Sequence, residues 1–130
     1  MPSHARPARL RSSCPIAAAL DLLGDRWTLL VLRDVLVFKK ALFGEFLASP
    51  EKLSSNTLAE RLKRLERAGL LRQEVYQRRP KRCRYIATAK GRDLLPLLVE
   101  ALKWGTRHVA GTAPFTAAQL RQLRARAARG

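Results

Sequence analysis

The feature that most constrains the fold of this chain is a basic helical segment that leads directly into a basic hairpin. Three leucines recur at the spacing of one helical face and predict an amphipathic helix over 54–68: Leu58, Leu62 and Leu65. Gly69 follows, at the position where a residue with positive φ commonly ends a helix. Residues 54–92 contain twelve Lys and Arg but only three Asp and Glu. A basic helix beside a basic hairpin is typical of proteins that place a helix in a DNA groove and a wing on the DNA backbone.

The composition narrows the class of protein further. The chain has 130 residues, enough for one domain with its own core, and its net charge of +16 indicates a polyanionic partner. No apolar run approaches the roughly 20 residues of a membrane span, and the basic start lacks the apolar segment of a secretory signal. We therefore expect no membrane association and a cytoplasmic, nucleoid-associated protein that keeps both cysteines reduced. Two cysteines without a matching histidine pair also exclude a zinc finger.

The first half of the chain is predicted to be helical. Residues 1–13 are expected to form a flexible basic arm. Apolar residues then recur at helical spacing over 14–23 and 26–37, and the second of these helices is apolar almost all round, which is typical of a core helix. Asp25 is a suitable cap for that second helix. A short helix is expected over 43–47.

The second half adds the hairpin and two further helices. Strands are predicted over 71–77 and 82–87, followed by one long helix over 88–109. Pro96 lies early enough in this helix to be tolerated, with a risk of a kink there. A last helix begins at Thr116, where Gln119 completes a capping box. The resulting order, α-α-α-α-β-β-α-α, is a mainly α fold with a small β-hairpin and predicts a winged helix-turn-helix.

Several separated motifs resemble the HxlR-type winged-helix transcriptional regulators of bacteria, which are related to the MarR group. The motifs that carry the resemblance are Cys14-Pro15-Ile16, LDLLGDRWTLLVLRD (20–34), FGEF (43–46), LAERLKRLERAGLL (58–71) and the tyrosine-framed YQRRPKRCRY (76–85). The resemblance covers residues 14 to about 105. It implies a homodimer with flanking N- and C-terminal dimerisation helices, and sequence-specific operator binding with the 54–68 helix in the major groove.

The chain departs from the family pattern in the wing and at its end. Lys81 and Arg84 stand where a proline and an acid are common, so this wing is more basic than usual, and Ala87 replaces a larger apolar residue. The segment 111–130, with its short helix, lies outside the common pattern. We therefore expect three parts: the arm, a winged helix-turn-helix domain over 14–110 that includes the dimerisation helices, and a C-terminal extension.

The start and one side of the 54–68 helix supply candidate contacts to DNA bases. Short polar side chains at a helix N-terminus can reach base edges and phosphates, and this helix starts with four of them: Ser54, Ser55, Asn56 and Thr57. One of the four must serve as the cap. Arg61 and Arg64 follow one turn apart, and arginine can donate two hydrogen bonds to guanine. The alternative is a solvated helix face on which Glu60 pairs with Arg64.

The predicted hairpin supplies candidate contacts to the DNA backbone. Five cations stand close together in it without an acid between them: Arg78, Arg79, Lys81, Arg82 and Arg84. Their mutual repulsion favours an anionic partner. A hairpin that is merely soluble is the alternative.

Cys14 is a candidate sensor of oxidants or electrophiles. A thiol at a helix N-terminus close to Arg11 favours the reactive thiolate form, and some members of the resembled family use the corresponding cysteine in this way. The alternative is a small apolar residue in the dimer interface, and Cys83 is interpreted as packing. Trp27 and Trp104 are expected in the core and the dimer interface.

No enzyme signature, metal site or cofactor motif is found in the sequence. We therefore expect a transcriptional repressor that is not an enzyme and needs no cofactor. It should bind double-stranded DNA sequence-specifically as a homodimer. A nonspecific architectural or nucleoid DNA-binding protein is one alternative, against which the polar start of the 54–68 helix argues. An RNA-binding module is another, although such modules usually stack exposed aromatic residues on bases. The sequence leaves any small-molecule effector open.

Overall fold

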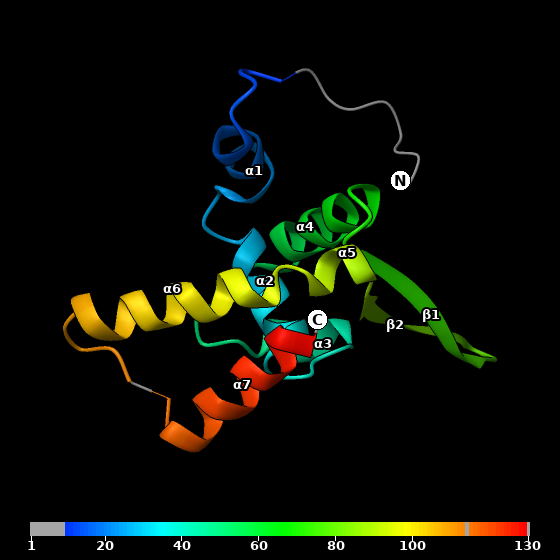
Figure 1. Cartoon of the computed structure of the whole chain (residues 1–130). Helices are drawn as coiled ribbons and strands as arrows, with labels where there is room; N and C mark the ends of the chain where they lie inside the picture. Colours follow the sequence, from blue (N-terminus) through cyan, green and yellow to red (C-terminus); the bar gives the residue numbers. More distant parts are fainter. Residues whose placement is uncertain (1–9, 114, 130) are drawn as a thin grey trace.

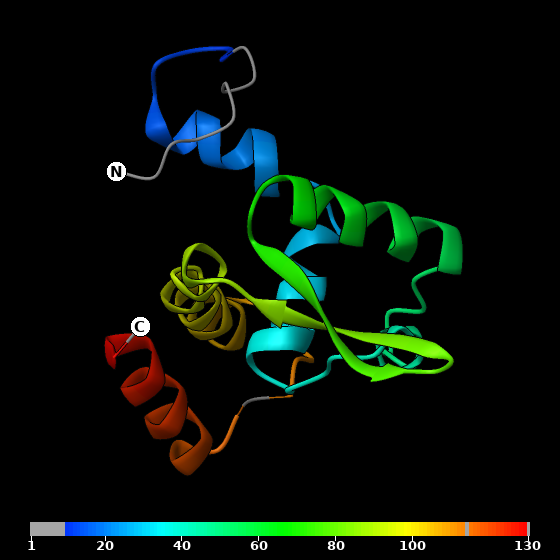
Figure 2. The same ribbon diagram turned by 90° about the vertical axis from the view of Figure 1, so that its right-hand side faces the viewer.

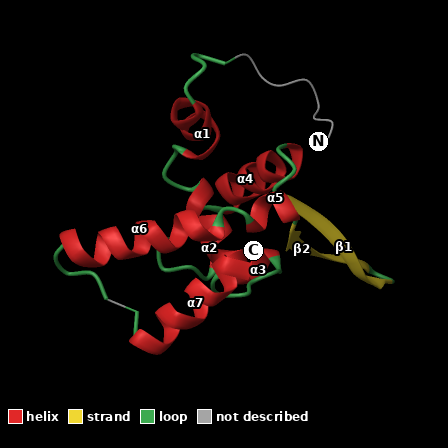
Figure 3. Ribbon diagram, viewed as in Figure 1, coloured by secondary structure: helices red, strands yellow, loops and turns green. Residues whose placement is uncertain are grey.

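The computed structural model describes residues 10–113 and 115–129, so residues 1–9 of the predicted arm lie outside the described part. Within the described residues, the fold is mainly helical with one two-stranded sheet, as predicted for a winged helix-turn-helix (Figures 1 and 3). The elements are α1 (Pro15–Leu23), α2 (Thr28–Leu36), α3 (Phe43–Leu47), α4 (Ser55–Arg67), β1 (Leu71–Arg78), β2 (Lys81–Ala87), α5 (Ala89–Arg92), α6 (Leu95–His108) and α7 (Ala117–Arg129).

α4 turns its leucine face into the core, as its spacing predicts. Leu58, Leu62 and Leu65 expose at most 1% of their surface, and they share one apolar cluster with Val31 and Leu32 of α2. Burying each leucine contributes roughly 2 kcal/mol, so the three together fix the rotation of α4 about its axis. Of the candidate caps at the helix start, Ser54 is the one that caps it, and Gly69 ends the helix with a φ of 77°, as predicted.

α2 begins two residues later than its sequence pattern predicts. The Asp25 carboxylate accepts hydrogen bonds from the N–H groups of Trp27 (3.1 Å) and Thr28 (3.2 Å), and also from the Thr28 hydroxyl. The N-cap residue is therefore Trp27 and not Asp25 as predicted, but the Asp25 carboxylate still binds the first N–H groups from three positions before the helix begins. Near the other end of α2, buried Asp34 accepts from Arg33 (2.8 Å) and Ser49 (2.5 Å), which ties α2 to the turn after α3.

The hairpin extends away from the helices (Figure 1) and is a twisted antiparallel ribbon (Figure 2). Its strands are longer by one residue on each side of the turn than predicted, so only Arg79 and Pro80 connect them. The register shifts between Val75 and Gln77, which is a bulge in β1. At the base of the hairpin, the Tyr85 N–H donates to the Ala41 carbonyl (2.8 Å) and fastens β2 to the segment before α3.

The prediction of one long helix after the hairpin is wrong, because the structure divides it into α5 and α6. In a continuous helix the nitrogen of Pro96 would face the Arg92 carbonyl, but proline has no N–H to donate and its ring collides with that carbonyl. The helix therefore ends at Arg92 and starts again at Leu95, with Pro96 in the first turn, where the missing N–H costs nothing.

α5 approaches the base of the hairpin so closely that one position requires glycine. A Cβ atom added to Gly91 would lie 2.2 Å from the Leu70 carbonyl oxygen. The same carbonyl accepts from the Thr88 N–H (3.1 Å), and the Thr88 hydroxyl donates to the Gly69 carbonyl (2.6 Å). These hydrogen bonds join the end of α4, the start of β1 and α5 in one packed corner.

The C-terminal helix α7 folds back against α6 (Figure 1). Its predicted capping box is confirmed, since the Gln119 N–H donates to the Thr116 hydroxyl (3.1 Å) and the Gln119 side chain accepts from the Thr116 N–H (2.8 Å). Leu123 is buried in the core, and the ring of Phe115 lies 6.5 Å from that of Phe38. The extension is therefore packed onto the domain.

By contrast, α1 stands apart from the helical body in both views (Figures 1 and 2). Ile16 and Leu20 expose 72% and 56% of their surface, although their spacing is that of an apolar helix face. Trp27 packs against the core as expected, whereas Trp104 on α6 is 63% exposed. Among the described residues, no helix is long and apolar enough to cross a membrane.

Gly91→Ala should lower the free energy of unfolding by about 2–3 kcal/mol, because the new methyl group displaces the Leu70 backbone. Urea unfolding of the purified protein measures this decrease. Gly44→Ala is the matched control. Apart from its chain neighbours and the backbone of its own helix, no described heavy atom comes within 4 Å of a Cβ there, so its effect should lie between zero and a gain of about 1 kcal/mol. Equal stability of the two variants would contradict the close approach of α5.

Candidate nucleic-acid interface

The N-terminus of α4 presents two free polar side chains beside its cap. The Ser54 hydroxyl accepts from the Thr57 N–H (3.2 Å) and donates to the Thr57 hydroxyl (3.0 Å), so these two candidates hold each other. Ser55 and Asn56 are exposed. Helix N–H groups and exposed polar side chains at such a terminus suit phosphates and base edges.

The outward face of α4 carries cations that are absent from the predicted site. Asn56, Glu60, Lys63 and Arg67 are all exposed and recur at helical spacing, on the side opposite the buried leucines. The signal for them is present in the sequence, because the leucine stripe defines its own opposite face. This outward face has one acid and two cations.

Arg61 and Arg64 instead turn toward the segment between α1 and α2. The Nε of Arg61 donates to the Asp25 carboxylate at 2.8 Å, and Arg64 lies 3.7 Å from the same carboxylate. Arg64 also donates to the backbone carbonyls of Asp21 (3.1 Å) and Leu22 (3.3 Å) in the last turn of α1. Both candidate arginines therefore connect α4 to the N-terminal part of the chain.

Asp25 is the functional residue that sequence reasoning interpreted only as a helix cap. Burial raises the pKa of its carboxyl group, but hydrogen bonds from Thr28, Arg61 and the Trp27 N–H, together with the charge of Arg61, lower it further. The net result is a pKa well below the ordinary value of an aspartate. Asp25 is thus held ionised as the common partner of two arginines on α4.

The tip of the hairpin carries four exposed cations close together. Arg78, Arg79, Lys81 and Arg82 flank or form the turn, all exposed, and none forms an ion pair within the described part of the chain. Closer to the helices, the Nε of Arg84 donates to Glu74 (3.0 Å) on the opposite strand, so this fifth cation is neutralised. Positive charge is therefore concentrated at the end of the hairpin, farthest from the helical body.

Cys14 lies at the N-cap of α1, where it is exposed, and its N–H donates to the Ser12 hydroxyl (3.2 Å). Arg11, the predicted neighbour of the thiol, is bound by Asp21 (2.6 Å). Cys83 is half-buried opposite Val75 in the hairpin, and both cysteines are free. Among the described residues, no group of three or more His, Cys, Asp or Glu could hold a metal ion.

A family model described as HxlR-like helix-turn-helix matches residues 22–113, which include α2 to α6. The chain belongs to the HxlR family. The HTH-type transcriptional regulator sll1512 of Synechocystis is 37% identical over 93 residues, which is 72% of this chain and 68% of that protein. Two solved structures of regulators are also similar. The reduced form of the transcriptional regulator YodB from Bacillus subtilis is 30% identical with a TM-score of 0.62, over 78% of this chain and all of that one.

The second structure, the redox regulator HypR in its oxidised form, is 28% identical with a TM-score of 0.66, over 73% of this chain and 97% of that one. These similarities make the HxlR-type chain a DNA-binding transcriptional regulator rather than an enzyme. The match of the family model ends at residue 113, so α7 lies beyond it.

Asp25→Asn in this HxlR-type protein should lower the free energy of unfolding by about 1–2 kcal/mol at pH 7, because charge-assisted hydrogen bonds are removed. The folded-state pKa is depressed, so the carboxylate stabilises the fold fully above the unfolded value of about 3.9 and progressively less below it. Urea unfolding at pH 7 and pH 3 should show the gap between the two proteins narrowing at pH 3. Asp93→Asn, which changes an exposed carboxylate, is the control. If the stability difference between wild type and Asp25→Asn stays constant with pH, the effect of the substitution comes from packing and not from the charge.

Proposed function

We propose that this HxlR-type regulator binds a pseudo-palindromic operator as a homodimer and represses transcription by occupying promoter DNA. In this arrangement α4 lies in the major groove and the hairpin contacts the adjacent backbone. The observation that carries the proposal is the pairing of an exposed polar face on α4 with four exposed cations at the hairpin tip. The site of action would be the chromosome, in the cytoplasm.

Base readout is assigned to the first turn and outward face of α4. Ser55 and Asn56 are free to reach base edges. Ser54 supports this turn as the cap, and the Thr57 hydroxyl, which accepts from Ser54, keeps its own proton to donate to a phosphate. Lys63 and Arg67 extend the same exposed face toward the backbone.

Arg61 and Arg64 remain candidates for DNA contact, but hydrogen bonds to Asp25 and to the end of α1 restrict the orientation of their side chains. Each guanidinium has five donors, and only some of them are engaged within the chain. The remaining donors can bind DNA while the arginine stays attached to Asp25. Such arginines would bind in a fixed orientation.

The hairpin is assigned to phosphate contacts that carry no sequence information. Arg78, Arg79, Lys81 and Arg82 are exposed, and with about four phosphates neutralised per protomer the log–log dependence of affinity on salt should have a slope near −7.

The homodimer is supported by the apolar surface that one chain leaves exposed. Ile16 and Leu20 on α1 and Trp104 on α6 are more than half exposed, and Val109 next to α6 is nearly so. Large contiguous apolar patches are uncommon on monomers, and the two helices are those that the family resemblance assigns to dimerisation. In this division of the chain, residues 14–110 form the DNA-binding domain with its dimerisation helices.

Regulation through Cys14 is supported by its exposure at the start of α1 and by the relatives. HypR is described as a redox regulator, and YodB has been solved both reduced and after diamide treatment. In this chain α1 is hydrogen-bonded to α4 through Arg64, so a change at Cys14 has a physical route to the DNA-binding helix.

Selection of bound duplexes from a random pool at about 150 mM salt, with the reduced protein, tests the proposal. An enriched inverted repeat with half-sites about one helical turn apart is the expected result. Strong retention without an enriched motif would favour a nonspecific architectural protein, and weak retention of every duplex would favour RNA as the partner.

Arg79→Ala should weaken binding to operator and random DNA by the same factor, because an arginine that binds phosphate does not read sequence. The magnitude of the salt slope should fall by about 1 for each phosphate that is no longer neutralised. Fluorescence anisotropy over a series of salt concentrations measures both quantities. Arg124→Ala removes the same charge from the exposed side of α7 and should leave the slope unchanged. A decrease in affinity for the operator alone would contradict the assignment of the wing.

Diamide should release the wild-type protein from its operator, and Cys14→Ser should abolish this response without changing the affinity of the reduced protein. Gel-shift titration before and after oxidation, followed by re-reduction with dithiothreitol, measures the effect. Cys83→Ser is the matched control and should respond as the wild type does. A diamide response that persists in Cys14→Ser would exclude Cys14 as the sensor.

A further inference from the structure

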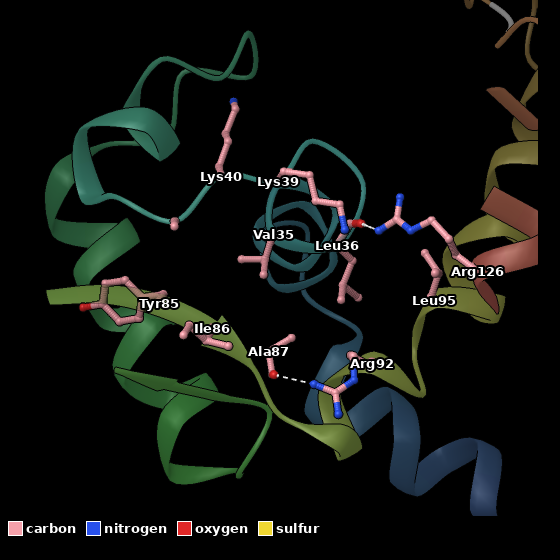
Figure 4. Close-up of a pocket in the computed structure, with 11 residues that line it drawn as sticks. Val35, Leu36, Lys39, Lys40, Tyr85, Ile86, Ala87, Arg92, Leu95 and Arg126 are labelled. Carbon is pink, nitrogen blue, oxygen red and sulfur yellow. Dashed lines mark hydrogen bonds between the residues drawn. The ribbon is translucent and has the colours of Figure 1, made fainter. Parts of the chain in front are cut away.

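A pocket of about 350 Å³ opens where α2, β2, α6 and α7 meet (Figure 4). Its volume lies within the range of roughly 300–1,000 Å³ that is typical of small-molecule sites. Four separate parts of the chain line it: the end of α2 with the following loop, the base of the hairpin, the α5–α6 junction and α7. No single stretch of sequence indicates it.

The floor of the pocket is apolar. Aliphatic side chains from three elements form it: Val35, Leu36, Ile86, Ala87 and Leu95. Ala87 contributes only a methyl group to this floor. The floor therefore suits a ligand with an apolar body.

The rim of the pocket is positively charged. Lys39, Arg92 and Arg126 line it, and within the described part of the chain none of the three forms an ion pair. Lys40 also lines the pocket, but its ammonium group donates to Ser49 (2.9 Å) and lies 3.7 Å from Asp34, so its charge is already compensated. Among the described residues, no carboxylate lines the pocket.

Two of these cations are held in place by backbone carbonyls. Arg126 donates to the Leu36 carbonyl, and Arg92 donates to the Ala87 carbonyl (2.9 Å). Figure 4 shows the side chains of Lys39 and Arg126 directed toward one another from opposite sides of the opening. Burial lowers the pKa of Lys39, and the nearby charge of Arg126 lowers it further, so the two like charges already act on each other. An anion between them would remove this repulsion.

We propose that this pocket binds a small organic monocarboxylate whose apolar body rests on the aliphatic floor and whose carboxylate bridges Lys39 and Arg126. A guanidinium offers paired donors that match a carboxylate, and Arg126 has donors left after bonding to Leu36. Arg126 lies on α7, beyond the region that the family model matches, so the C-terminal extension contributes one of the two cations that would hold the carboxylate.

The location of the pocket gives the ligand a route to the DNA-binding surface. Tyr85, Ile86 and Ala87 form one wall, and they belong to the strand that carries the wing. A bound carboxylate would also tie α7 to the loop after α2. The expected effect on operator affinity rests on the proposed function, whereas binding itself does not.

The test is a ¹H–¹⁵N NMR titration of the full chain, without DNA, using benzoate, 3-phenylpropionate and hexanoate. Saturable shifts at Ile86, Ala87 and Leu95 are expected for at least one of the three, and much weaker binding for the corresponding uncharged amide. Arg126→Gln should weaken binding by about tenfold, as expected when a charge-assisted hydrogen bond is removed. Lys39→Gln tests the same anion site if the first variant destabilises α7.

Arg124→Gln is the matched control, because it removes an exposed charge from the same helix without lining the pocket. The proposal is overturned if no carboxylate gives saturable shifts, if the amide binds equally well, or if Arg124→Gln weakens binding as much as Arg126→Gln. A second measurement, operator affinity with and without the bound carboxylate, separates the two proposals. If the protein binds the carboxylate but not the operator, the pocket proposal is supported and the proposed regulator function is contradicted. If it binds the operator but no carboxylate, the pocket proposal is contradicted and the regulator function is supported.

Discussion

The burial of three leucines of α4 against α2 is the interaction on which the rest of the structure depends. Leu58, Leu62 and Leu65 are almost completely removed from solvent, so α4 has only one rotational setting against the core. That setting directs Lys63 and Arg67 outward. It also directs Arg61 and Arg64 sideways toward the end of α1. One apolar contact thereby separates the surface offered to DNA from the hydrogen bonds that attach the N-terminal helix.

The few acids of this basic chain serve mainly as internal anchors. Asp25 holds two arginines of α4, Asp34 and Glu51 hold Arg33 at the end of α2, and Glu74 holds Arg84 in the hairpin. The cations that face these acids are therefore compensated. Those at the hairpin tip and around the pocket form no ion pairs among the described residues, apart from Lys40. Part of the net charge of +16 therefore lies at the hairpin tip and around the pocket, where an anion can reach it.

Sequence patterns predicted the elements wherever a local signal was decisive. The cap at Ser54, the left-handed Gly69, the capping box at Thr116 and the hairpin each depend on residues within a few positions of one another, and all are found in the structure. The prediction failed at Pro96, because the apolar spacing continues through a position whose backbone cannot continue the helix. Periodicity indicates only which side chains are apolar, whereas the helix breaks because the backbone of Pro96 has no N–H group to donate.

The sequence by itself determined the order of elements as far as the hairpin, the buried stripe of α4, the charge of the hairpin and the resemblance to HxlR regulators. These follow from side-chain type and short-range spacing. Only the tertiary structure decided that Asp25 holds Arg61 across 36 positions and that Lys39 and Arg126 meet over one pocket. The physical reason is that ion pairs and cavities form between segments whose approach is set by the packing of the whole core. The charge pattern within one segment does not indicate which distant charged residue that segment will contact.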